Sequence, residues 1–126
     1  MTIDFDPTHK ADLVVNVLSW AYQNQFQPGT FDVFCCPPCT EFSVALTTRP
    51  RNMVLADALV QKTLEKVAYL KPRRWYLENP RTGKLKDRPY MQGLPFVDVE
   101  YCQFGDWGTR NLQGYGATRQ SAHWRT

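Results

Sequence analysis

Three closely spaced cysteines and a later Glu-Asn pair are the residues whose side chains could carry chemistry. Cys35, Cys36 and Cys39 follow an apolar run, and Glu78 and Asn79 follow the apolar residues 75–77. The two prolines before Cys39 fix φ and favour extended backbone at the preceding residues, so this thiol is presented on a stiff loop. Such a thiol could be a redox partner, a metal ligand or a nucleophile.

Dithiol redox chemistry is one interpretation of these cysteines. Cys36 and Cys39 form a C-x-x-C pair in a chain of thioredoxin size, and a helix after such a pair lowers the pKa of a thiol. However, Cys35 occupies the position where thioredoxin-like motifs usually have an aromatic residue. No helix is predicted between the first strands either. A C-x-x-C oxidoreductase is therefore an alternative function.

A zinc site is the second interpretation. Structural zinc sites usually take their ligands from two closely spaced pairs, and this sequence has one such pair. Neighbouring side chains of a strand point to opposite faces, so Cys35 and Cys36 cannot easily bind one ion. We therefore expect no metal, although the residues that would form the site are Cys35, Cys36, Cys39, Cys102, His9 and His123.

Covalent catalysis on a nucleobase is the third interpretation. A cysteine thiolate can attack carbon 6 of a cytosine while a carboxyl group protonates or hydrogen-bonds ring nitrogen 3, and carbon 5 then becomes nucleophilic enough to accept a methyl group. This chemistry needs one cysteine and one carboxyl group at the same edge of a site. Cys39 and Glu78 are of the required types, and Asn79 could hold the glutamate by hydrogen bonding.

The elements that must position these residues are strands separated by one clear helix. Strands are expected at residues 3–5, 13–18, 31–36, 75–77 and 97–102, and the apolar spacing predicts a helix over 51–70. The segment 13–22 would also suit a helix, and an irregular loop separates the last two strands. This order favours an α/β fold with an open, mostly parallel sheet. In such a sheet ligands bind beyond the carboxyl ends of the strands, where Cys39 and Glu78 are expected.

Composition limits the class of protein. The 126 residues suit one domain. No run of about 18 apolar residues is present, and the start lacks the pattern of a secretory signal. We therefore expect an intracellular protein without membrane contact. The net charge is +3, and one basic segment could contact DNA phosphates. We call this the basic segment, and its basic residues are Lys71, Arg73, Arg74, Arg81, Lys84, Lys86 and Arg88.

The motifs resemble those of the DNA (cytosine-5)-methyltransferases. Pro38-Cys39-Thr40-Glu41-Phe42-Ser43 is similar to the catalytic Pro-Cys loop of that family, and Glu78-Asn79 is similar to its Glu-Asn signature, with a helix between them as the family has. The resemblance implies a truncated S-adenosylmethionine-dependent methyltransferase fold of the Rossmann-like type. It also implies Cys39 as nucleophile, Glu78 as the group at cytosine nitrogen 3, and Asn79 as its support.

The resemblance extends to both sides of these motifs. It implies that Asp4, Asn16 and Pro38 face the cofactor S-adenosyl-L-methionine, and that Arg110 contacts the base or a phosphate. Residues 1–110 would then be a partial catalytic domain, and 111–126 a divergent, flexible tail.

Part of the family pattern is missing from this sequence. The family's glycine-rich cofactor turn is not found before Thr2. A second chain would have to supply that turn, or the protein would be inactive. A non-catalytic DNA-binding remnant is therefore a further alternative.

Overall fold

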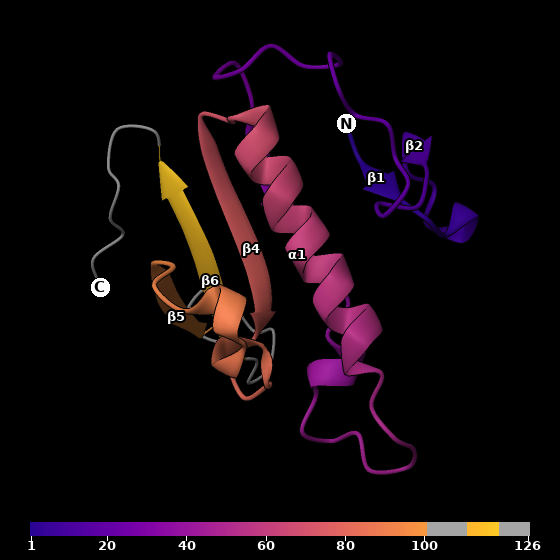
Figure 1. Ribbon diagram of the computed structural model, residues 1–126, viewed down its shortest axis with the longest axis vertical. Coiled ribbons are helices and arrows are strands. Elements are labelled where there is room, and N and C mark those ends of the chain that lie inside the picture. Colours follow the sequence, from indigo (N-terminus) through magenta and orange to yellow (C-terminus); the bar gives the residue numbers. More distant parts are fainter. Residues whose placement is uncertain (101–110, 119–126) are drawn as a thin grey trace.

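The computed structural model describes residues 1–100 and 111–118, with side chains through residue 98 (Figure 1). Its larger sheet has four strands: β3 (Asp32–Cys35), β4 (Arg74–Pro80), β5 (Phe96–Glu100) and β6 (Asn111–Thr118). Their order is β3-β4-β6-β5, in which β3 and β4 are parallel and both pairs that include β6 are antiparallel.

The parallel pair β3 and β4 is connected through the helix α1 (Met53–Leu70). Parallel neighbours need such a crossover because the chain must return to the starting end of the sheet. Asn52 caps the helix by accepting from the Leu55 backbone N–H at 3.1 Å, and Lys71 ends it in the left-handed region at φ 47°. Pro72 follows and cannot continue the helix.

The hydrophobic core lies between α1 and one face of β4. Val60 on the helix, Leu77 on the strand and Phe42 from the preceding turn are all fully shielded from solvent. Further core members come from the loop after β4, and the complete buried cluster is Phe42, Ala56, Val60, Leu77, Leu85 and Met91. This core joins the loop before α1, which carries Cys39, to β4, which carries Glu78 and Asn79, and to the loop after β4.

A second, two-stranded parallel sheet contains β1 (Ile3–Asp4) and β2 (Leu13–Val14). In the described residues it is not hydrogen bonded to the larger sheet, and in Figure 1 the helix α1 lies between this pair and β4. Four short 3-10 turns complete the described elements: η1 (Pro7–His9), η2 (Thr40–Phe42), η3 (Leu85–Asp87) and η4 (Pro89–Met91). In the described part of the chain, no helix is long and apolar enough to cross a membrane.

Most of the predicted elements are confirmed, with shifted ends. The helix begins at Met53, two residues later than predicted, and ends at Leu70 as predicted, and β1, β3 and β5 lie within or beside their predicted ranges. The expected strand 13–18 is shorter, because from Asn16 the backbone turns and Asn16 O accepts from Ser19 N and Trp20 N. Conversely, β4 does not stop at Glu78 but continues to Pro80, because β6 pairs with it along its whole length.

Two expectations about the larger sheet are not confirmed. The open, mostly parallel sheet is not confirmed, since β5 and β6 join the larger sheet antiparallel and without a helical crossover. The expected flexible tail also differs from the structure over residues 111–118, which form β6. This strand lacks an apolar alternation, but it lies between β4 and β5, so backbone hydrogen bonds on both sides stabilise it. Residues 119–126 lie outside the described residues.

Candidate active site

Cys39 lies immediately after the carboxyl end of β3, on a loop fixed at both ends. It precedes η2, and its carbonyl oxygen accepts from the Phe42 backbone N–H at 3.0 Å. Phe42 is fully buried in the core and therefore anchors this turn. The Cys39 side chain is half-buried, so it is neither sealed inside nor freely solvated.

Glu78 and Asn79 lie on β4, the parallel neighbour of β3, near its carboxyl end. Successive residues of a strand point to opposite faces, so the two side chains diverge. Asn79 points into the interior, where only 2% of its surface is exposed, whereas Glu78 is half-buried on the other face.

A hydrogen bond from Asn79 joins the two parts of the candidate site. Its Nδ2 donates to the Pro37 carbonyl oxygen at 3.3 Å, two residues before Cys39. Its Oδ1 is buried and has no hydrogen-bond partner, which is uncommon for a buried acceptor. The structure therefore brings the Cys39 loop and the Glu78-Asn79 pair to the same edge of the sheet.

The turn after β4 packs against the Cys39 loop. Lys84 N donates to the Phe42 carbonyl oxygen at 2.9 Å. A Cβ atom at Gly83 would lie 3.1 Å from the Pro80 carbonyl oxygen and 3.4 Å from that of Phe42, so the close approach of these backbones favours glycine. Sequence reasoning did not identify Gly83 as part of the site.

Glu78 has a cysteine neighbour on the outer face of the sheet. Phe34 pairs with Tyr76 and Cys35 with Leu77, so the next residues along the two strands, Cys36 and Glu78, also lie beside each other. Burial raises the pKa of Glu78, and the contact with the Cys36 thiol opposes this increase only in part. The carboxyl group consequently retains its proton to a higher pH than an exposed glutamate does.

The thiols of Cys35 and Cys36 are both held in the protonated form. Burial raises the pKa of Cys35 to about 12, and burial together with the charge of Glu78 raises the pKa of Cys36. A thiolate is the reactive form in both disulfide exchange and nucleophilic attack. These surroundings therefore oppose a C-x-x-C redox role for Cys36, and Cys39 is the remaining candidate nucleophile among the three described cysteines, all of which are free.

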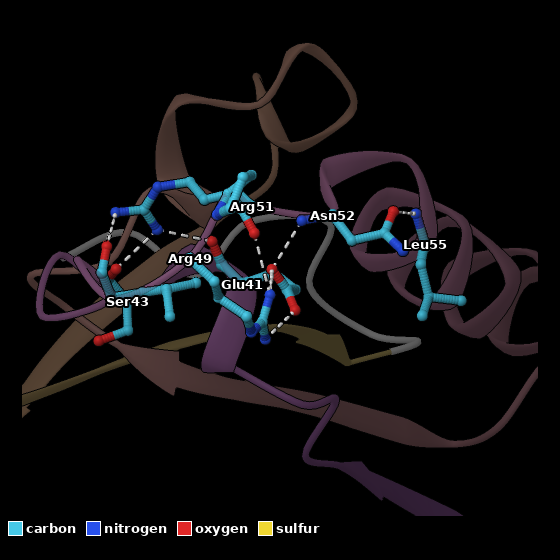
Figure 2. A network of polar contacts seen from close by, with 8 residues as sticks. Glu41, Ser43, Arg49, Arg51, Asn52 and Leu55 are labelled. Carbon is cyan, nitrogen blue, oxygen red and sulfur yellow. Dashed lines mark hydrogen bonds and ion pairs between the residues drawn. The ribbon is translucent and has the colours of Figure 1, made fainter.

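A polar network that sequence reasoning missed holds the loop between η2 and α1 (Figure 2). The Glu41 carboxylate accepts from Arg49 Nη2 at 2.6 Å and from the Asn52 backbone N–H at 2.7 Å. Arg51 Nη1 donates to the carbonyl oxygens of Glu41 and Ser43 at 2.7 and 2.6 Å. The spacing of Glu41 and Arg49 gave no sequence signal, because an irregular loop separates them.

Asp4 and Asn16, the residues expected to face a cofactor, lie at the carboxyl ends of β1 and β2: Asp4 is the last residue of β1, and Asn16 follows β2 by two residues. The Asp4 carboxylate accepts from the Asp6 backbone N–H at 2.9 Å and binds His9 Nδ1 at 2.8 Å, and these contacts lower the pKa of Asp4. Asn16 is exposed, and its Oδ1 accepts from Leu18 N at 2.9 Å. Both residues share one end of the small sheet, but that sheet is not hydrogen bonded to the one that carries Cys39, as described above.

Acidic residues outside the basic segment pair with several of its arginines. Arg73 binds Asp32 through two hydrogen bonds of 3.0 and 3.1 Å, and Arg81 lies 3.4 Å from Asp98. Arg88 likewise makes a two-point ion pair with Asp57. The segment is therefore less available to phosphates than its sequence indicates, although Lys71 and Lys84 are exposed.

Not all of the predicted site residues can be located in the structure. Pro38 is next to Cys39 and is exposed. Arg110, Cys102 and His123 lie outside the described residues. Within residues 1–98 and the other described positions, no group of three or more histidine, cysteine, aspartate or glutamate side chains is arranged to hold a metal ion.

Comparison with known proteins relates this chain to the DNA (cytosine-5)-methyltransferases and confirms the resemblance as a partial match to that family. The relative is a protein of frog virus 3 (isolate Goorha) described as a probable DNA (cytosine-5)-methyltransferase. The two are 34% identical over a 113-residue alignment that covers 79% of this chain and 52% of the relative. The chain thus spans about half the length of the curated relative. No family model and no solved structure matches it.

Proposed function

We propose that this chain carries the catalytic centre of a DNA cytosine-5 methyltransferase, in which Cys39 attacks carbon 6 of a cytosine. The observation that carries the proposal is the Asn79–Pro37 hydrogen bond, because it places the thiol loop and the Glu78-Asn79 pair at one edge of the sheet. A half-buried thiol on a loop anchored by Phe42 also has the restricted geometry that covalent catalysis needs. The relative's description supports DNA as the substrate.

Glu78 is proposed as the acid for nitrogen 3 of the cytosine. The Cys39 thiol first loses its proton to solvent, and its sulfur then forms a bond to carbon 6. The electron pair of the carbon 5–carbon 6 double bond forms a carbon 4–carbon 5 double bond, the pair of the carbon 4–nitrogen 3 double bond moves to nitrogen 3, and nitrogen 3 receives the proton of the Glu78 carboxyl group. The raised pKa of Glu78 supports this role, because an acid must hold its proton until the attack.

The cofactor site is less complete than the thiol site. DNA (cytosine-5)-methyltransferases generally use S-adenosylmethionine, which supplies the methyl group that carbon 5 accepts. Asp4 and Asn16 offer suitable oxygen acceptors, but their described contacts are to their own loops, and their sheet is not hydrogen bonded to the larger one. The described residues therefore do not form a cofactor pocket by themselves. We propose that a second chain, or further sequence of the same protein, completes it.

Covalent trapping on DNA tests the proposed nucleophile. In the presence of excess S-adenosylmethionine, duplex DNA with 5-fluorocytosine in its target strand should form an adduct with the chain, visible as a species that survives denaturation. Cys39→Ser should abolish the adduct, whereas the matched control Cys35→Ser should retain it. An adduct that survives in Cys39→Ser, or salt-sensitive DNA binding without any adduct, would contradict the proposal; the latter result would identify a DNA-binding remnant.

A separate titration tests the cofactor proposal. Calorimetry with S-adenosylmethionine should show weak binding to this chain alone, because the described residues form only part of a pocket. Tight binding that Asp4→Ala removes would show instead that the chain is sufficient. The two measurements are linked, because fluorine at carbon 5 blocks release of the cysteine only after carbon 5 has been methylated. The affinity from calorimetry therefore sets the S-adenosylmethionine concentration at which trapping must be tested.

A further inference from the structure

The loop that follows Cys39 is tied to the start of α1 through one carboxylate. Only 16% of the Glu41 side chain is exposed, and both of its carboxylate oxygens are used. Oε1 accepts from Arg49 Nη2 at 2.6 Å, while Oε2 accepts from Arg49 Nη1 at 3.2 Å and from Asn52 N at 2.7 Å. Figure 2 shows Glu41 between these partners.

The backbone of the same residue is held as well. The Glu41 carbonyl oxygen accepts from Arg51 Nη1 at 2.7 Å, and the same nitrogen reaches the Ser43 carbonyl oxygen at 2.6 Å. Asn52 caps α1, so its backbone N–H lies at the positive end of the helix, where a carboxylate is stabilised. Glu41 thus fixes the position of η2 relative to the helix from both its side chain and its main chain.

Movement of η2 would move Cys39. The residues are two positions apart, and the bond from Phe42 N to the Cys39 carbonyl oxygen makes Cys39 part of the same turn. The prolines at 37 and 38 restrict the chain on the other side of the thiol. Without the contacts of the Glu41 side chain, only the Arg51 bonds to the Glu41 and Ser43 carbonyl oxygens in this polar network would hold η2 to the start of α1, and the orientation of the thiol would vary.

We infer that Glu41 is a positioning residue that orients the Cys39 thiol through η2 by binding the start of α1. This inference rests on the proposed function in one respect, the role of Cys39 as nucleophile. Arg49 and the Asn52 N–H also hold the pKa of Glu41 below its usual range, so the carboxylate stays charged through the pH range of ordinary assays.

Substitutions at Glu41 and at a matched carboxylate test the inference. Glu41→Ala removes all side-chain contacts, whereas Glu41→Gln keeps an acceptor for Asn52 N and loses the charge. Asp57→Asn is the control, because Asp57 is 18% exposed and makes a comparable ion pair, with Arg88, away from the Cys39 loop. Hydrogen exchange in the absence of DNA should accelerate over residues 40–52 in Glu41→Ala, less in Glu41→Gln, and not in Asp57→Asn.

The trapping rate at saturating 5-fluorocytosine DNA supplies the functional measurement. It should fall about tenfold to a hundredfold in Glu41→Ala, as expected for a displaced nucleophile, while DNA affinity changes less than about twofold. Unchanged exchange over 40–52 in Glu41→Ala, or an equal effect of Asp57→Asn on that segment, would overturn the inference. If the wild-type chain forms no adduct, the proposed function fails, and the exchange measurement still decides whether Glu41 holds the loop.

Discussion

Substitution of Asn79 should separate the stability of the fold from the reactivity of Cys39. Asn79→Ala removes the hydrogen bond to the Pro37 carbonyl oxygen, which costs about 1 kcal/mol, and loses packing contacts worth a similar amount. It also removes the unpaired Oδ1, whose burial costs about 1–3 kcal/mol in the native protein. These contributions oppose each other, so the free energy of unfolding should change by less than about 1 kcal/mol.

The same substitution should slow covalent trapping of 5-fluorocytosine DNA by about tenfold or more, because the Cys39 loop loses its link to β4. Asn79→Asp provides the contrast. At a site with 2% exposure the new carboxyl group must either remain charged without a partner or take up a proton, and the resulting loss of stability is about 3 kcal/mol or more at neutral pH.

Denaturation in urea, followed by circular dichroism, measures the free energies, and the rate of adduct formation is measured on the same preparations. A loss of more than about 3 kcal/mol in Asn79→Ala would refute the claim that its Oδ1 is an unsatisfied acceptor. An unchanged trapping rate would refute the claim that Asn79 positions the thiol loop.

Two further predictions follow from the perturbed carboxyl groups. Cys36→Val removes the thiol contact that lowers the pKa of Glu78, so nuclear magnetic resonance should show Glu78 titrating at a higher pH than in the wild type; a lower value would contradict the proposed contact. Burial raises the pKa of Asp57, but hydrogen bonds from Arg88 and Tyr90 outweigh burial and hold it below 3.8. The stabilising contribution of Asp57 should therefore be complete above pH 3.8 and disappear as the pH falls through its lower native pKa. In pH-dependent denaturation, Arg88→Met should reduce this loss of stability in acid. An unchanged pH dependence would count against the ion pair.

The sequence predicted the parts of the fold that local patterns control. The helix followed from apolar residues at helical spacing, with Pro72 after it, and β3 and β4 followed from short apolar runs before prolines. These two strands and their crossover were sufficient to place Cys39 and Glu78-Asn79 at a common edge. The order of strands around a parallel pair is largely fixed by such a crossover, so this part of the site was predictable.

The remaining parts depend on contacts between distant segments. Residues 111–118 have no apolar alternation, and their strand exists because β4 and β5 offer backbone partners on both sides. The carboxylates that neutralise the basic segment, such as Asp32 and Asp57, lie far from it in the sequence. Likewise, the burial of Glu78 and its contact with Cys36 follow from strand register, which composition does not reveal.

A structure of the chain trapped on duplex DNA with 5-fluorocytosine would test the central claim most directly. The claim predicts that the sulfur of Cys39 is bonded to carbon 6 of the base and that the Glu78 carboxyl group lies within hydrogen-bond distance of nitrogen 3. A base bonded to another cysteine, or a Glu78 side chain turned away from the ring, would contradict it.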